Sequence, residues 1–274
     1  MSNAAGIDVC RAWKPTLAGV SEVFHASFTE HAYPRHCHDT WTVLIVDAGA
    51  VRYDLDRHPR AASPKAVTVL PPFVAHDGQS ARPGHSFHKR VLYVDTDTIS
   101  EGLIGAAVDR STIEDAALRQ SISRLHQALG DAHDDLEPES LLALIAERIA
   151  GSLVGSPETT APGRPSPAWS SAAAEALRAE LDARSFERLD LGDLAAELGW
   201  NPTHLIRSFT RQYGLPPHRY LISRRLDEAR RQLLHGMAPA AVAANVGFHD
   251  QAHLGRHFKA HLGVTPGRYR PART

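Results

Sequence analysis

The sequence predicts a multi-domain α+β protein: an N-terminal β-barrel with an αα-hairpin, followed by an all-α domain with two helix-turn-helix units joined by a long helix. Three observations predict this fold. Short strand-like runs fill residues 20–95, apolar residues at helical spacing follow in residues 112–153, and one sequence pattern occurs twice between residues 194 and 269.

The strand-like runs are bounded by Gly, Pro and Asp, which favour turns. Several short strands with turns between them are typical of a sandwich or a barrel. We therefore assign residues 1–110 to a barrel. The runs are Trp41–Val46, Val51–Leu55, Ala66–Leu70 and Arg90–Val94.

Residues 111–154 are predicted to form the helical hairpin, because two apolar stripes at helical spacing are separated by Gly130–Pro138. These stripes either cover the barrel or form a dimer interface, and we expect the hairpin to serve dimerisation. Residues 155–170 are predicted to form a linker, because fourteen of them include four prolines and two glycines. Residues 171–274 then make the all-α domain.

The repeat in this last domain is explicit. Residues 194–200 (LAAELGW) match residues 242–248 (VAANVGF), and residues 205–210 (LIRSFT) match residues 254–259 (LGRHFK). In each unit a short helix ends at a glycine, which takes a left-handed backbone at low cost, and the next aromatic residue is expected to fill the turn. A second helix then begins, with Asn201 or Asp250 as its N-cap.

Between the two units, residues 217–235 are predicted to be one helix. Nineteen helical residues span about 28 Å, close to the ~34 Å between successive major grooves on one face of B-DNA. The spacing therefore suits two recognition helices in adjacent grooves. Four arginines on this helix could meet either phosphates or acidic neighbours: Arg224, Arg225, Arg230 and Arg231.

Residues 172–271 resemble the AraC family of transcription regulators. The resemblance is strongest in residues 247–259 (GFHDQAHLGRHFK) and 263–270 (GVTPGRYR). Leu254 stands where the family usually has an aromatic residue, and His249 and Gly255 replace common serines. The resemblance implies two sets of DNA contacts, with Arg211 and Lys259 near phosphates. The first set is Thr203, Ile206, Arg207 and Arg211, and the second is Gln251, Ala252, Gly255, Arg256 and Lys259.

These residue types suit base recognition. Arg pairs bidentately with guanine, Gln with adenine, and small apolar groups meet the thymine methyl. The alternative for Arg207 and Arg256 is an ion pair that supports the fold. The charge distribution agrees with a polyanionic partner, since residues 189–274 carry a net +6 and the rest of the chain −7.

Residues 34–94 resemble the cupin-like effector domain found in many AraC-family regulators. The matching segments are residues 34–39 (PRHCHD), 70–76 (LPPFVAH) and the strand over residues 87–95. His36 and His38 share one face of a strand, with Cys37 on the other. The resemblance implies a small-molecule pocket with Tyr53 or Trp41 as an apolar wall and Arg90 favouring an anion. The expected effector-binding residues are His36, His38, Trp41, His76, His88 and Arg90.

Three histidines also fit part of the metal site of cupin enzymes. Those enzymes add a carboxylate a few residues later, where this sequence has Thr42 and Val43, and Phe73 stands where a glycine is usual. A metal site, a metal-free pocket and ordinary core histidines therefore stay open. We assign no metal, no cofactor and no catalytic residues.

The expected function is that of a sequence-specific DNA-binding transcription activator that is controlled by a small-molecule effector. The alternatives are a metal-dependent cupin enzyme fused to a DNA-binding module and a ligand-independent DNA-binding dimer. No apolar run approaches the ~18–20 residues of a membrane span, so we expect a cytoplasmic protein without a membrane partner. The expected partners are double-stranded DNA, the effector and a second copy of the chain, with RNA polymerase left open.

Overall fold

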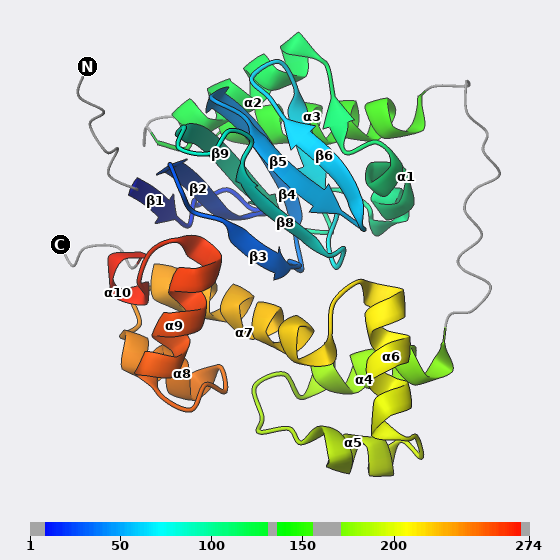
Figure 1. Cartoon of the computed structure of the whole chain (residues 1–274). Helices are drawn as coiled ribbons and strands as arrows, with labels where there is room; N and C mark the ends of the chain where they lie inside the picture. The colour runs from blue at the N-terminus through cyan, green and yellow to red at the C-terminus, as the bar shows by residue number, and fades with distance from the viewer. Residues whose placement is uncertain (1–8, 131–135, 156–170, 270–274) are drawn as a thin grey trace.

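The computed structural model describes residues 9–130, 136–155 and 171–269 (Figure 1). The predicted linker lies almost wholly outside the described residues. The described helices and strands fall into a β-rich N-terminal half and a helical C-terminal half, as predicted. Among the described residues, no helix has the length and apolar content that crossing a bilayer requires.

The N-terminal half contains two antiparallel sheets. One has the strand order β1-β2-β9-β4-β7-β10, and the other has the order β3-β8-β5-β6. The first sheet comprises β1 (Val9–Trp13), β2 (Val20–Phe28), β9 (Phe87–Val94), β4 (Trp41–Ala48), β7 (Val67–Leu70) and β10 (Thr112–Ile113). The second comprises β3 (Tyr33–His36), β8 (His76–Ser80), β5 (Val51–Leu55) and β6 (His58–Ala62).

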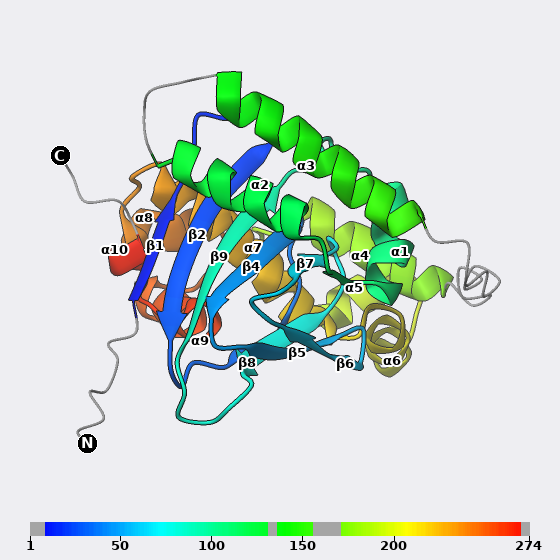
Figure 2. The same cartoon turned by 90° about the horizontal axis from the view of Figure 1, so that it is seen from above.

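The predicted hairpin covers the first sheet. A short 3-10 turn (Glu101–Leu103) and α1 (Ile104–Asp109) lead to α2 (Ala116–Ala128) and α3 (Leu136–Val154), which lie across the sheet's outer face (Figure 2). Ile122 and Ile145 of these helices belong to the same buried cluster as Trp41 and Val43 of β4. Of the two alternatives for the apolar stripes, the structure shows the first, and dimerisation through this hairpin stays a prediction.

The C-terminal half holds seven helices in its described part. They are α4 (Ala172–Ala183), α5 (Leu191–Glu197), α6 (Pro202–Tyr213), α7 (Pro217–Leu234), α8 (Pro239–Asn245), α9 (Gln251–Leu262) and α10 (Pro266–Tyr269). The repeat appears as two helix pairs, α5–α6 and α8–α9. Asn201 caps α6 by accepting hydrogen bonds from the backbone of Thr203 and His204, and Asp250 caps α9 at His253. Gly199 and Gly247 have φ of 71° and 78°, as the predicted turns require.

The two turns differ in how their aromatic residue is placed. Phe248 fills the second turn as predicted and is 4% exposed. Trp200, its counterpart, is 42% exposed and stacks on His204 of α6, with the two rings 5.2 Å apart. The prediction that both aromatics fill their turns is therefore wrong for Trp200.

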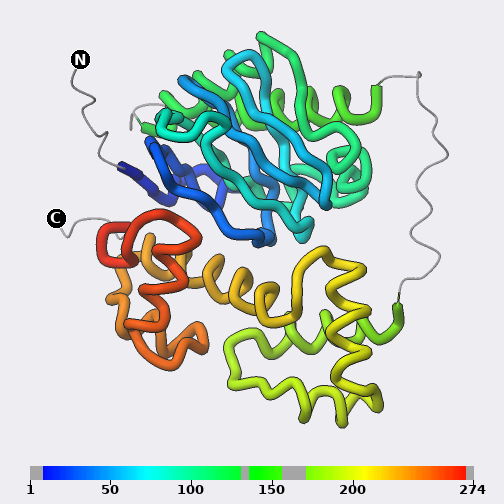
Figure 3. Tube along the Cα trace, viewed as in Figure 1, coloured from blue at the N-terminus to red at the C-terminus, as the bar shows by residue number. Residues whose placement is uncertain are grey.

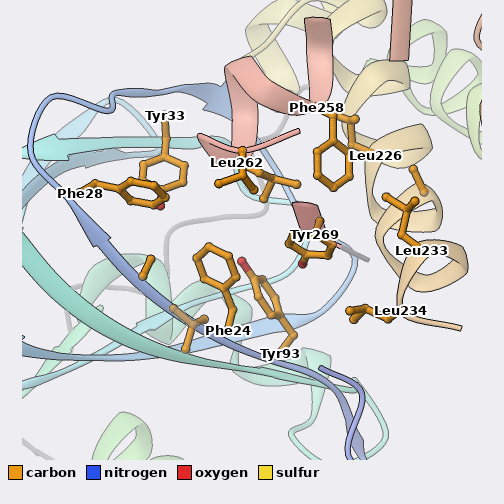
Figure 4. Packing of buried hydrophobic residues seen from close by; sticks show 14 of the residues in the cluster. Phe24, Phe28, Tyr33, Tyr93, Leu226, Leu233, Leu234, Phe258, Leu262 and Tyr269 are labelled. Carbon is orange, nitrogen blue, oxygen red and sulfur yellow. The ribbon is translucent and has the colours of Figure 1, made fainter. Parts of the chain in front are cut away.

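The two halves share a core, which Figure 4 shows from close by. Phe24 and Phe28 of β2 pack in one cluster with Leu233 of α7, Phe258 of α9 and Tyr269 of α10. Helix α7 runs beneath the sheets and connects the two helix pairs (Figure 3). The β-rich half is therefore packed directly on the connecting helix and on the second helix pair.

Four of the five arginines of α7 bind protein groups, and the fifth, Arg219, is exposed. Arg230 pairs with Glu22 (2.9 Å) and Asp227 (3.3 Å). Arg225 donates to the carbonyl oxygens of Ser185 and Glu187. The remaining pairs are Arg224 with Asp39 (3.0 Å) and Asp182 (3.1 Å), and Arg231 with Asp39 (3.0 Å) and Glu228 (2.8 Å). Acidic and carbonyl neighbours, not phosphates, account for these four arginines.

Phe73 adopts a left-handed backbone, with φ of 62°, at the position where the sequence departs from the usual glycine. Such a conformation costs a non-glycine residue about 1–3 kcal/mol. The ring lies under two guanidinium groups of the C-terminal half, those of Arg178 (4.6 Å) and Arg224 (5.7 Å). These cation–π contacts give a physical reason for a large side chain at a position that favours glycine.

Gly263, which ends α9, lies at a close contact between the two halves. Its φ is 77°, and an added Cβ would lie 2.8 Å from Cε1 of Phe28. Gly236 has a similar φ of 85° but open space around it. We expect Gly236→Ala to lower the free energy of unfolding by about 1 kcal/mol through backbone strain alone. Gly263→Ala should lower it by about 2–4 kcal/mol, because overpacking against Phe28 adds to that strain.

Urea denaturation of both variants beside the unchanged protein measures this difference. Equal losses for the two variants would mean that the halves are not held at the observed distance.

Candidate functional site: a cavity between the two halves

A cavity of about 730 Å³, including its solvent-filled mouth, lies between the sheets and the C-terminal helices. Strands of both sheets line it, and so do α7 and α9. The polar residues from the strands and their loops include His36, His38, Thr42, Tyr53, His76, Lys89 and Tyr93, and those from the helices are Ser223, Asp227, Arg230 and His261. A molecule in this cavity would therefore touch both halves of the protein.

Three of the expected residues meet here: His36 at the end of β3, His38 just beyond it, and His76 at the start of β8. One ring nitrogen of each lies within 4.8 Å of the others. The Nε2 atoms of His36 and His38 are 3.1 Å apart. Burial lowers the pKa of His76 to about 4 and holds the pKa of His36 and His38 well below the usual range. The three imidazoles are therefore neutral at pH 7.

Two basic side chains, Lys89 and Arg230, line the same cavity. The Lys89 ammonium lies 3.9 Å from the centre of the Tyr33 ring, and burial lowers the pKa of Lys89 to about 7. Arg230 lies 3.9 Å from the Tyr93 ring, and its partner Glu22 also accepts a short hydrogen bond from the Tyr269 hydroxyl. Arg230 is thus fully engaged by protein groups, whereas Lys89 forms no ion pair within the described ranges.

The Thr42 hydroxyl is a further polar group of the cavity. Thr42 is 6% exposed, and its Oγ1 has no hydrogen-bond partner among the described residues. A buried hydroxyl without a partner costs about 1–3 kcal/mol. A polar ligand atom in the cavity would remove this cost.

Three of the expected effector residues do not line the cavity. Within β9, Lys89, Val91 and Tyr93 point into it, so His88 and Arg90 lie on the opposite face of the strand. His88 is exposed, and Arg90 pairs with Asp47 (2.7 Å) and donates to Ser123 of α2. The expectation that His88 and Arg90 line the pocket is therefore wrong, and Lys89, which lies between them and does line it, was missed.

Trp41 is corrected for a similar reason. It is completely buried among the residues that β4 shares with α2 and α3. Its indole N–H donates to the carbonyl oxygen of Ile99 at 2.7 Å. Tyr53, the other residue considered for the apolar wall, does line the cavity, and its hydroxyl is 2.9 Å from that of Ser111.

The residues expected to contact DNA lie on α6 and α9. The core-facing residues of these helices, Leu205, Phe209, Leu254 and Phe258, are completely buried. The opposite faces carry the expected contacts, which are exposed except for the half-buried Gly255: Thr203, Ile206, Arg207 and Arg211 on α6, and Gln251, Ala252, Gly255, Arg256 and Lys259 on α9. Within the described ranges, neither Arg207 nor Arg256 forms an ion pair, so the alternative of a fold-supporting pair has no observed partner.

Both helices also touch the β-rich half. Arg57, in the turn between β5 and β6, donates to the carbonyl oxygens of Thr210 (3.0 Å) and Arg211 (2.9 Å) at the end of α6. Helix α9 packs against β3, the strand that carries His36. Both α6 and α9 are therefore in direct contact with the β-rich half that lines the cavity.

Comparison with known proteins agrees with this architecture. Residues 18–146 match the family model of the AraC-like ligand binding domain, and residues 194–272 match that of a helix-turn-helix domain. The chain belongs to the AraC family of transcription regulators: it is a DNA-binding regulator with an N-terminal ligand-binding domain.

Individual relatives support the same conclusion. The chain is 25% identical over 229 residues to the HTH-type transcriptional regulator YbfI of Bacillus subtilis, covering 81% of each protein. It is 34% identical over 84 residues to the transcriptional activator AarP of Providencia stuartii, covering 30% of this chain and 62% of AarP. In structure it is similar to a single-residue variant of apo ToxT from Vibrio cholerae, with a TM-score of 0.61 at 12% identity over 92% of this chain and 97% of ToxT.

Proposed function

We propose that a small organic anion bound in the cavity controls how α6 and α9 bind DNA. The observation that carries this proposal is the shared wall of the cavity, which combines strands of the ligand-binding domain with α7 and α9 of the DNA-binding half. A ligand that contacts both halves can bind one arrangement of them better than another, which is the requirement for a shift in population.

The lining supports an anion with an apolar body. Val51, Leu70, Val91 and Leu226 supply apolar surface, while among the described residues Lys89 has no ion-pair partner and the Thr42 hydroxyl no hydrogen-bond partner. A lysine kept in a largely buried site lowers stability, which favours a functional reason for its presence. ToxT has been crystallised with an unsaturated fatty acid and with a naphthyl-substituted butenoic acid, both of them carboxylic acids.

The proposal extends to the finer expectations. The DNA contacts are the exposed residues of α6 and α9, the protein is a regulator rather than an enzyme, it acts in the cytoplasm, and it activates transcription as a dimer. AarP, which is similar over the helical half, is an activator.

The experiment is a binding titration with the full chain and the DNA upstream of its own gene, over a series of salt concentrations. Specific binding should fall steeply with salt, because Lys and Arg release counterions from phosphates. A medium-chain carboxylic acid should change the affinity for DNA in the unchanged protein and not in Lys89→Met. Equal affinity for this DNA and a scrambled duplex at every salt concentration would contradict DNA-sequence recognition, and an unaltered affinity with all carboxylic acids would contradict the effector.

A further inference from the structure

The hydrogen bonds of the three cavity histidines determine which ring nitrogen of each carries the proton and which carries a free lone pair. Nδ1–H of His36 donates to the carbonyl oxygen of Pro34 (2.7 Å), and Nδ1–H of His76 donates to that of Val74 (3.0 Å). A carbonyl oxygen only accepts, so both Nδ1 atoms carry the proton. Because a neutral imidazole has a single N–H, both Nε2 atoms present lone pairs.

His38 is oriented from the other half of the protein. Its Nδ1 lies 2.9 Å from Oδ1 of Asp227 on α7, so Nδ1–H donates to that carboxylate and Nε2 faces His36 at 3.1 Å. A carboxylate or carbonyl behind each histidine is the usual arrangement around a bound metal ion. Without an ion, the Nε2 lone pairs of His36 and His38 would face each other at 3.1 Å in a buried space, unless His38 carries its proton on Nε2 and accepts from Arg230 at 3.3 Å.

We propose that His36, His38 and His76 bind a divalent transition metal ion of the Zn²⁺ type, and that His261 of α9 supplies the fourth ligand. Two nitrogens bound to one tetrahedral Zn²⁺ at ~2.0–2.1 Å lie about 3.3 Å apart. The observed 3.1 Å between two of the ligand nitrogens is close to this, and the third, at the 4.8 Å limit, would need to approach by about 1.5 Å. Neutral imidazoles without a carboxylate favour Zn²⁺, Ni²⁺ or Cu²⁺ over Mg²⁺ or Ca²⁺.

His261 connects this ion to the DNA-binding half. Its ring centre is 6.0 Å from that of His36, and the two rings are nearly perpendicular. Its Nδ1–H donates to the carbonyl oxygen of His257 within α9 (2.8 Å), so its Nε2 is also a lone pair. The ion would thus add a coordination bond between α9 and the strands β3 and β8 to the packing already present there, whereas a ligand set from the barrel alone would form no bond to α9.

The test uses the full chain without an affinity tag, treated with a chelator and titrated with Zn²⁺ and with Co²⁺. We expect one ion per chain at micromolar protein and an intense visible Co²⁺ spectrum, which indicates four-coordinate nitrogen ligation. His36→Gln should abolish binding, and His261→Gln should weaken it by at least about tenfold. The Co²⁺ spectrum of the unchanged protein tests the site even where a variant does not fold.

The control is the half-buried pair His253 and His257, whose Nε2 atoms are 3.1 Å apart and form the competing site on α9. His253→Gln/His257→Gln should leave stoichiometric binding intact. Loss of binding in this control, or weak six-coordinate Co²⁺ in the unchanged protein, would overturn the proposal. Unaltered affinity in His261→Gln would overturn the role of α9.

The link from metal to DNA rests on the proposed function, and the experiment separates the two. DNA binding is measured on the chelator-treated protein first and is expected with or without the ion. Adding Zn²⁺ should then change the affinity for DNA about fivefold or more, and His261→Gln should remove this effect. A protein that binds DNA but no metal contradicts only the metal site, and one that binds metal but no DNA contradicts only the proposed function.

Discussion

Replacing Arg230 by alanine is expected to lower the free energy of unfolding by about 3–5 kcal/mol. Arg230 is 4% exposed and lies between Glu22 of β2 and Asp227 of α7. Its guanidinium also covers the Tyr93 ring. Without it, two buried carboxylates lose their counter-charge, and the cost of keeping them out of water is no longer offset. Urea denaturation measures the loss.

Arg124→Ala is the control for this variant. Arg124 pairs with Glu137 at 2.6 Å, but the two side chains are 59% and 42% exposed, so the loss should be below about 1 kcal/mol. The double variant Glu22→Gln/Arg230→Met should be more stable than Arg230→Ala, because it removes the charge of Glu22, one of the two buried carboxylates left without a counter-charge. An Arg230→Ala loss no larger than that of Arg124→Ala would mean that the halves are not docked through this cluster.

The second large effect concerns DNA. Arg207→Ala and Arg256→Ala should each weaken specific binding by about 1–3 kcal/mol, which is roughly 5–150-fold. Both side chains are exposed at corresponding positions of the repeat, and neither forms an ion pair within the described ranges. The alanine side chain has no donor that could replace the hydrogen bonds from the guanidinium to guanine. Fluorescence anisotropy with the upstream DNA and a scrambled duplex, at one salt concentration, measures the change.

Arg124→Ala serves again as the control, because it removes the same charge from α2, on the far side of the β-rich half (Figure 1). It should leave the affinity for both duplexes unaltered. If both arginine variants bind the specific duplex like the unchanged protein, other residues of α6 and α9 make the base contacts. If they lose affinity equally for both duplexes, the two arginines contact phosphates.

The helical half could be predicted closely because its pattern occurs twice. Two copies with the same glycines, caps and core-facing residues constrain each other, and α7 begins and ends within one residue of the predicted helix. In the β-rich half, the strands could be located but not all oriented. Strand β9 is apolar on both faces from Val91 to Val94, since one face lines the cavity and the other is covered by α2 and α3.

That double burial explains the error in the cavity lining. Residues 88–90 are three basic residues in a row, so hydropathy does not alternate there and the strand's orientation cannot be deduced. Only the packing of β9 settles it, with Lys89, Val91 and Tyr93 lining the cavity and Leu92 and Val94 in one cluster with α2 and α3. Asp227, Arg230 and His261 were missed for a different reason, because their partners in the cavity lie about two hundred residues away in the sequence. For α7, the available signal was the pair of opposite charges Asp227 and Arg230, three residues apart among leucines, which indicates a buried ion pair.

Helix α7 has a consequence for the choice of promoter. Its eighteen residues span about 27 Å, and one helix pair is packed near each end. A rotation of about 10° around its midpoint would move each end by roughly 2 Å in opposite directions, given that length. Successive base pairs are about 3.4 Å apart along the axis of B-DNA. If α6 and α9 occupy adjacent major grooves as expected, the tilt of α7 would set the spacing between two half-sites, and a molecule in the cavity would then select promoters by half-site spacing as well as by sequence.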